Sequence, residues 1–111
     1  MGVELLSKLE DPELSIATAI DRLETITTNP RTTRRILETA ADRGVIERSG
    51  STIRPRGGNY VRFESEVITK EGDFHCRRCG ANLSTGYFIS LDSGELGPFG
   101  SSCIRSVTGR D

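Results

Sequence analysis

Three cysteines carry the most recognisable chemistry of the sequence. Cys76 and Cys79 form a CxxC pair followed by Gly80, and 23 residues separate Cys79 from Cys103. A CxxC turn brings two thiolates onto one tetrahedral metal ion, with each sulfur about 2.3 Å from the ion when it is zinc. The sequence therefore predicts a structural Zn²⁺ site with Cys76, Cys79 and Cys103 as ligands.

The fourth ligand of this site is not evident from the spacing. A second CxxC would require a cysteine at position 100, which is Gly100. His75 is the only histidine and is the preferred candidate by its chemistry. Its neighbour Cys76 would then have to bind the same ion, which demands an unusual backbone. The alternatives are water, a group from a partner chain, Asp73, Asp92 and Glu95.

The cysteines have two other interpretations. They could be buried apolar residues or a redox-active CxxC, but the flanking segments lack the strand, helix, strand pattern of thioredoxin-like proteins. Between the CxxC and Cys103, residues 87–90 and the turn at 92–94 predict a β hairpin. Ser101 or Ser102 could cap a short helix over 103–107. Knuckle, hairpin and helix-borne ligand follow in the order of a treble-clef zinc module, and a ribbon-like module is the related form.

The first half of the chain is of a different kind. All six aromatic residues, all three cysteines and nine of the twelve glycines follow residue 56. Residues 1–56 are aliphatic and helix-prone, so we predict a boundary within residues 56–59. The prediction is an α+β fold with two domains, residues 1–58 and residues 59–111.

Apolar residues at helical spacing predict three helices in the first half. The first is short and ends near Glu10. The second begins at Asp11-Pro12 and runs over about residues 12–26. The third begins at Asn29-Pro30, a capping residue followed by proline, and ends at Gly44.

The pattern alternates after Gly44. Residues 45–48 and 52–56 surround Ser49-Gly50-Ser51, which predicts a two-stranded hairpin. Three helices followed by a basic hairpin is the element order of a winged helix-turn-helix. The string NPRTTRRILETAADRGVIERSGSTIRP resembles the recognition helix and wing of that superfamily.

Charge is divided unevenly along the first half. Residues 1–30 hold two basic and six acidic residues, a net charge of −4, whereas residues 31–58 hold seven arginines and three acidic residues, a net charge of +4. The net charge of −1 for the whole chain conceals this difference. A basic segment of this kind favours an anionic partner.

The winged-helix resemblance implies a partner in double-stranded DNA. It places a recognition helix, about residues 30–43, in the major groove and a wing, residues 45–56, on the DNA backbone. Arginine can bond guanine O6 and N7 together or hold a phosphate. The other interpretation is a solvated basic face whose arginines pair with nearby acids such as Glu38. The candidate DNA-binding residues are Arg31, Thr32, Arg34, Arg35, Arg54 and Arg56.

The second half carries a resemblance of its own. The string CRRCGANLSTGYFISLDSGELGPFGSSCIRSVTG resembles short zinc-binding modules with a CxxCG, a Leu-Ser/Thr stretch, a Gly-Pro and a final cysteine. The whole chain resembles an uncharacterised, mostly archaeal family of winged helix-turn-helix proteins with a C-terminal CxxC zinc module. This resemblance implies a DNA-binding transcriptional regulator. The second candidate is a protein-interaction module of the transcription machinery, since a winged helix with a zinc ribbon also resembles general initiation factors.

Other function classes find little support. The chain has no glutamate in HExxH or deaminase spacing, and its glycines form neither GxGxxG nor GxxxxGK, so we expect no enzyme. Apolar runs of a few residues are far shorter than the roughly 18 to 20 that a membrane span needs. The first residues lack the pattern of a signal peptide. We expect a cytoplasmic protein with no membrane partner and keep a homodimer as a candidate assembly.

Overall fold

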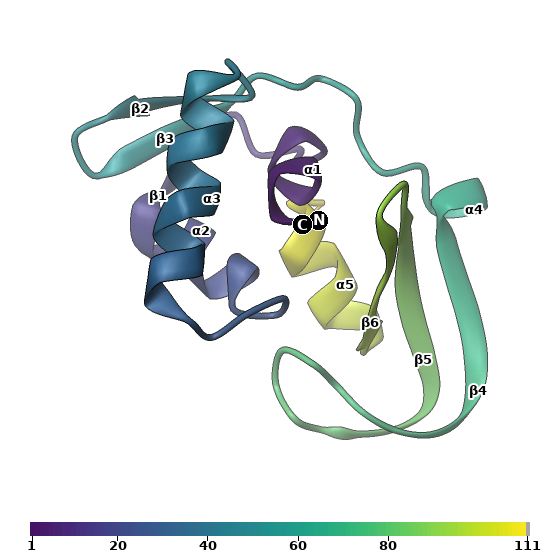
Figure 1. The fold of residues 1–111 in the computed structure, drawn as a ribbon. Helices are drawn as coiled ribbons and strands as arrows, with labels where there is room; N and C mark the ends of the chain where they lie inside the picture. The colour runs from purple at the N-terminus through teal and green to yellow at the C-terminus, as the bar shows by residue number, and fades with distance from the viewer. Residues whose placement is uncertain (111) are drawn as a thin grey trace.

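Two three-stranded antiparallel sheets organise residues 1–110, the part of the chain that the computed structural model describes (Figure 1). The first sheet has the strand order β1-β3-β2 and the second has the order β4-β5-β6. The predicted α+β class is confirmed. The elements of the first part are α1 (Gly2–Ser7), β1 (Leu14–Ser15), α2 (Ile16–Leu23), α3 (Pro30–Asp42), β2 (Ile46–Ser49) and β3 (Thr52–Pro55). The elements of the second part are α4 (Phe63–Glu66), β4 (Val67–His75), β5 (Asn82–Leu91), β6 (Gly94–Phe99) and α5 (Ser101–Thr108).

Helix α3 begins and ends where the sequence predicts. The side chain of Asn29 accepts a hydrogen bond of 2.9 Å from the backbone N–H of Arg31, and Pro30 occupies the first turn. At the other end Gly44 adopts a left-handed φ of 73°, which a glycine allows at no steric cost. The buried stripe of the helix consists of Thr33, Leu37 and Ala40.

Helix α2 is shorter than the predicted 12–26, so that prediction is wrong at its start. Leu14 and Ser15 form β1 and pair with β3, Leu14 lying opposite Ile53. The helix begins only after this strand, because Ser15 accepts a hydrogen bond of 3.0 Å from the N–H of Thr18 and acts as the N-cap. Leu14 pairs with a residue 39 positions away and is only 7% exposed, and the local cap signal contains no information on this burial.

Asp11 also differs from the prediction that a helix begins at Asp11-Pro12. Its carboxylate does not cap a helix but forms two hydrogen bonds with Arg22, Nη1 to Oδ1 at 2.5 Å and Nη2 to Oδ2 at 3.0 Å. Arg22 is only 8% exposed. A buried arginine requires a partner that satisfies its charge and its donors, and the fork-shaped contact with Asp11 provides one.

The predicted hairpin after α3 is confirmed. β2 and β3 pair across a turn at Gly50, with Glu47 opposite Arg54 and Arg48 opposite Ile53. Side chains alternate between the faces of a strand, so Arg48 shares the face of the buried Ile53 whereas Glu47 and Arg54 lie on the other face.

The second part contains more strand than the sequence predicts. The hairpin of β5 and β6 confirms the prediction around residues 87–94, but β4 and α4 were not predicted. Most residues of β4 are exposed, so its sequence shows little of the apolar alternation that predicts a strand. Its pairing with β5 also shifts register between Glu71 and Phe74. Ser101 and Ser102 do not cap α5: they lie inside it, and the N-cap is Gly100 without a side-chain bond.

One apolar core includes buried residues of both parts. Helices α1 and α5 lie between the two sheets, and residues 56–62, which are neither helix nor strand, connect the parts (Figure 1). Leu5 and Leu9 of the first part and Ile104 of the second belong to the same buried cluster, each at 2% exposure or less. The predicted domain boundary after residue 58 stays a prediction. No helix within residues 1–110 combines the length and the apolar character required to cross a membrane.

A carboxylate on α1 also joins the two parts. Glu4 accepts hydrogen bonds from the backbone N–H of Asp92 at 2.6 Å, from the N–H of Ser93 at 3.2 Å and from the Ser93 hydroxyl at 2.8 Å. Burial acts to raise the pKa of Glu4, but these donors outweigh it and hold the pKa below its ordinary value. The ionised carboxylate therefore stabilises the turn between β5 and β6 against α1.

We expect Glu4→Gln to lower the free energy of unfolding at pH 7 by about 1 kcal/mol, because an amide has one oxygen fewer to accept these three bonds. The folded-state pKa lies below the unfolded-state pKa, so the stabilisation is present above the unfolded-state pKa and is lost as the pH falls through the folded-state pKa. Chemical denaturation followed by circular dichroism from pH 7 to pH 3 measures both effects.

Glu64→Gln is the matched control, since Glu64 is exposed on α4 and should change stability little at any pH. A Glu4→Gln loss that is the same at pH 3 as at pH 7 would contradict a role for the ionised carboxylate.

Candidate functional site

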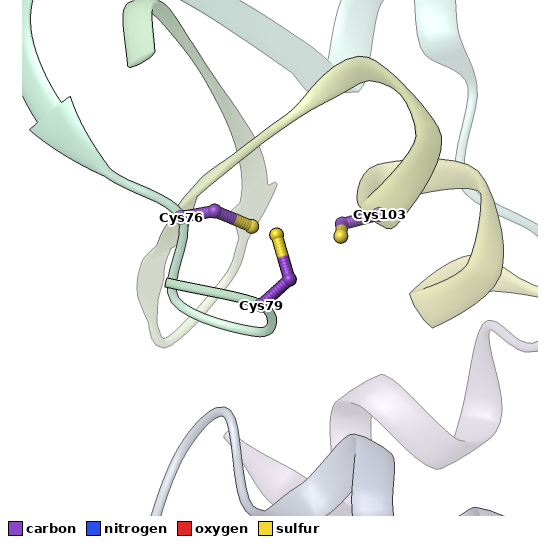
Figure 2. A group of neighbouring side chains, drawn as sticks. All are labelled: Cys76, Cys79 and Cys103. Carbon is purple, nitrogen blue, oxygen red and sulfur yellow. The ribbon is translucent and has the colours of Figure 1, made fainter. Parts of the chain in front are cut away.

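The three cysteines converge where the β4–β5 turn meets the start of α5. Cys76 and Cys79 lie in the turn, Cys103 lies in the first turn of α5, and Figure 2 shows the side chains pointing toward one another. Their Sγ atoms lie within 4.8 Å of one another. Three sulfurs bound to one tetrahedral ion at about 2.3 Å are about 3.8 Å apart, so a small approach would complete the site. These three residues could hold a metal ion.

Backbone hydrogen bonds shape the turn that carries two of the sulfurs. The N–H of Gly80 donates to the carbonyl oxygen of Cys76 at 2.8 Å, and the N–H of Cys76 donates to the carbonyl oxygen of Ala81, also at 2.8 Å. Gly80 has a φ of 78°, which reverses the chain. The N–H of Gly100 approaches the Sγ of Cys76 at 3.4 Å, and donors of this kind stabilise a thiolate.

The thiols differ in acidity. Burial acts to raise the pKa of Cys76, but the N–H groups of Cys79, Gly100 and Arg78 outweigh it and lower the pKa to about 7. Burial raises the pKa of Cys103 to about 11, against the Arg78 side chain and with the help of the two neighbouring sulfurs. Cys76 therefore exists partly as a thiolate near neutral pH, whereas a metal ion would have to displace the proton of Cys103.

His75 lies outside this group of sulfurs. It is the last residue of β4 and is exposed, whereas the side chain of Cys76 is buried. Adjacent residues of an extended chain project to opposite sides. Within residues 1–110 no histidine or carboxylate side chain joins the three sulfurs, and Glu95 is instead 2.7 Å from Lys70. The structure does not bring a fourth ligand to the cysteines, and His75 in that role stays a prediction.

The two arginines inside the CxxC motif contact α2 and its C-terminal turn, which sequence reasoning missed. Arg77 Nε donates to the carbonyl oxygen of Thr25. Arg78 Nη1 lies 3.7 Å from the Sγ of Cys103, and its Nε lies 3.7 Å from Oδ2 of Asp21. The middle positions of a CxxC motif have no pattern of their own, so only the fold reveals these contacts.

The four predicted contact residues of α3 are exposed and spread over about 160° of the helix surface, away from the buried Leu37 and Ala40. Residues of a helix follow one another by about 100°, so Thr32 and Arg34 are about 160° apart on opposite flanks. Thr32 lies on the flank of Ile36, which packs beside Gly2 of α1. Arg31, Arg34 and Arg35 are all exposed. Thr32 is exposed as well and lies about 60° around the helix from Arg35, so Thr32 and Arg34 lie on either side of Arg31 and Arg35.

The two predicted arginines of the wing are paired with carboxylates. Arg54 Nε lies 3.3 Å from Oε2 of Glu13, and Arg56 Nη2 lies 3.6 Å from Oε2 of Glu47. Both pairs involve the face of the sheet opposite to Ile53.

Arg48 of β2 is a residue of the hairpin that sequence reasoning did not select. It lines a groove of about 270 Å³ together with Arg34, and apolar side chains of Ile16, Ile20 and Leu37 line the same groove. Among residues 1–110, neither Arg34 nor Arg48 forms an ion pair with a carboxylate. The alternation of side chains along a strand could have identified Arg48 from the sequence. Residue 48 lies on the same face of the hairpin as residue 46, whereas residue 54 lies on the opposite face.

Comparison with known protein families gives a match over the whole chain. The model of DUF5830, a family of unknown function, matches residues 1–111. The chain belongs to this family. No curated protein and no solved structure matches this DUF5830 chain. Membership supports the resemblance to an uncharacterised family, and the winged helix, the archaeal origin and the zinc module within that resemblance stay predictions.

We expect Cys79→Ser to weaken metal binding by at least about 100-fold, because it removes one of three converging ligands. Cys79 is the exposed member of the group, so its replacement leaves the packing of Cys76 and Cys103 intact. Competition between the protein and a chromophoric chelator for Zn²⁺ measures the affinity, and the metal content measures the stoichiometry, expected to be one ion per chain. A Cys79→Ser protein that retains the parent's affinity would contradict the site.

His75→Ala in the same titration tests the fourth ligand. We expect an unchanged affinity, since the imidazole lies outside the group of sulfurs. A loss as large as that of Cys79→Ser would make His75 the fourth ligand.

Proposed function

We propose that this DUF5830 chain is a DNA-binding transcriptional regulator with a structural zinc ion. The observation that carries the proposal is the surface formed by Arg31, Arg34 and Arg35 of α3 and Arg48 of β2, which no carboxylate among residues 1–110 neutralises through an ion pair. A phosphate backbone is the partner that such a surface fits best. The element order α1-β1-α2-α3-β2-β3 supports a winged helix-turn-helix over residues 1–58.

In this proposal α3 enters the major groove and β2 with β3 forms the wing. Arg34 and Arg35 are the candidates for reading guanine, and Arg48 is the candidate for a phosphate contact. Arg54 and Arg56 would first have to leave Glu13 and Glu47. Exposed ion pairs are worth little, so the phosphate could compete for both arginines.

Three thiolates are the donor set that zinc favours in structural sites. We assign Cys76, Cys79 and Cys103 as its ligands in a treble-clef module, with water, a carboxylate or a partner's group as the fourth. His75, which is exposed outside the group of sulfurs, would bind only after a change in the backbone beside Cys76. The ion would tie the turn after β4 to the first turn of α5. No catalytic role is assigned to it.

The groove between α2, α3 and β2 favours a second candidate function. Its apolar residues Ile16, Ile20 and Leu37 could receive an apolar side chain from another protein, as in an interaction module of the transcription machinery. Such a module would bind duplex DNA weakly and without sequence preference, which separates it from a regulator.

We expect Arg34→Ala to weaken binding to a selected duplex by about 5- to 150-fold and to relax the preference at one base position, because one base contact contributes about 1 to 3 kcal/mol. Duplexes are first selected from a random pool with the parent protein and then titrated by fluorescence anisotropy. The exposed side chain of Arg34 is free to be removed without loss of packing.

Arg43→Ala is the matched control. It removes the same charge from the end of α3, but residue 43 lies on the flank of Thr32 and Ile36, so its effect should be small. Equal losses for Arg34→Ala and Arg43→Ala would contradict base reading by α3. No enriched duplex for the parent would favour the interaction module.

We expect Arg48→Ala to weaken binding to all duplexes alike and to lower the slope of log affinity against log salt by about one unit, as the loss of one phosphate contact does. Arg54→Ala should change the slope less, because Glu13 already pairs with that arginine. Titrations at several salt concentrations measure the slopes. A full unit lost with Arg54→Ala and none with Arg48→Ala would return the wing contact to Arg54.

A further inference from the structure

We propose that Arg77 and Arg78 are positioning residues that couple metal binding at the cysteines to α2 and the turn before α3. The coupling of metal to α2 stands on the contacts of the two arginines. Its consequence for DNA affinity rests on the proposed function.

Arg77 connects three segments of the chain. Its Nε donates to the carbonyl oxygen of Thr25 just beyond α2, and its Nη1 lies 3.4 Å from the carbonyl oxygen of Gly97 in β6. Its backbone N–H donates to the carbonyl oxygen of Pro98 at 2.8 Å. Thr25 is 3% exposed, so this bond reaches a buried point of the α2 end. A shift of the knuckle, residues 76–80, would therefore move the first residues of the turn before α3 through Arg77.

Arg78 makes a second connection from the same motif. It lies 3.7 Å from the Sγ of Cys103 through Nη1 and 3.7 Å from Asp21 through Nε. Asp21 is on α2, one turn before Thr25. Two adjacent arginines thus contact α2 and the turn after it, and both are placed by the two cysteines that flank them.

The contact surface is polar, so it can open without exposing the apolar core. A cavity of about 220 Å³ separates the knuckle from α2 and is lined by Asp21, Glu24, Thr25, Arg77 and Arg78. Polar groups around a cavity exchange their partners for water at small cost. Closure of the knuckle by a metal ion is therefore able to decide whether these contacts persist.

The other connections between the two parts do not depend on the cysteines. Glu4 of α1 holds the turn at Asp92 and Ser93, and the N–H of Glu10 donates to the carbonyl oxygen of Thr108 at 2.9 Å. These contacts keep the parts together when the knuckle opens. The expected effect of metal removal is thus confined to the cysteine turn, the first turn of α5, which carries Cys103, the end of α2 and the following turn.

The turn before α3 has amides that can report on this coupling. The N–H groups of Ile26 and Thr27 both donate to the carbonyl oxygen of Leu23, at 2.9 and 3.0 Å. The turn leads directly to Asn29, the N-cap of α3. A looser turn would let α3 move relative to Arg48, and with it the whole arginine surface.

Hydrogen exchange of the full chain with and without Zn²⁺ tests the coupling. In the parent we expect zinc to slow exchange at residues 76–80 and at residues 21–29, with little change in α1. In Arg77→Ala/Arg78→Ala, zinc should still slow exchange at 76–80 but no longer at 21–29. Arg105→Ala, which removes an exposed arginine of α5, is the matched control and should behave as the parent does.

Three results would overturn the proposal. The first is that zinc does not change exchange at residues 21–29 of the parent. The second is that zinc protects this segment in Arg77→Ala/Arg78→Ala as strongly as in the parent. The third is that chelation of the metal removes protection throughout α1. Arg77→Lys supplies a further check, because a lysine side chain can donate a hydrogen bond to the Thr25 carbonyl oxygen. This variant should keep part of the zinc protection at residues 21–29 that Arg77→Ala/Arg78→Ala loses.

DNA titration of the same proteins separates this inference from the proposed function. Zinc should raise the parent's affinity for its selected duplex by about fivefold or more, the usual range for coupled sites, and should raise that of Arg77→Ala/Arg78→Ala much less. A parent that binds DNA equally with and without zinc would overturn the regulatory inference alone. A parent that binds no duplex would overturn the proposed function, and hydrogen exchange would still decide the coupling.

Discussion

The burial of α1 between the two parts is the constraint on which the remaining structure depends. Leu5 and Leu6 are fully buried in a helix of only six residues, which is too short to be stable in isolation. It forms because it packs against α3 and because Leu5 and Leu6 belong to one apolar cluster with Ile104 and Val107 of α5. The chain has 34% hydrophobic residues and no tryptophan, so a core shared by both parts buries more apolar surface than two separate cores would.

Polar contacts around this core decide how each part is oriented. Glu4 ties α1 to the β5–β6 turn, and Arg22 ties α2 to Asp11 next to the first residues of β1. Arg77 and Arg78 tie the cysteine turn to α2 and the residues after it. Each of these contacts places a charged side chain against the main chain or against an opposite charge. The contribution of each contact to stability therefore depends on its hydrogen-bond geometry rather than on the buried area.

The charge pattern along the sequence becomes meaningful only with these partners in place. Residues 31–58 carry a net charge of +4, but Arg54 and Arg56 form ion pairs with Glu13 and Glu47. Among residues 1–110, the arginines of this segment without a carboxylate partner are Arg31, Arg34 and Arg35 on α3, Arg43 at its C-cap and Arg48 on β2. The structure therefore narrows a basic segment to a basic surface beside a groove.

The sequence by itself determined the features that depend on near neighbours. Asn29-Pro30 and Gly44 set the limits of α3, Gly50 set the turn of the hairpin, and the CxxC set the cysteine knuckle, because caps and turns act within a few residues. Only the tertiary structure decided the start of α2 and the strand β4. Both depend on pairing with strands distant in the chain, and no local pattern encodes that energy.

The candidate site divides in the same way. The convergence of three cysteines was predictable from spacing and residue type. The exposure of His75 away from the sulfurs and the partners of the arginines were not, since each depends on which distant element lies beside the side chain. A hydrogen bond such as that from Arg77 to Thr25 joins residues 52 positions apart, and only the folded chain brings its donor and its acceptor together.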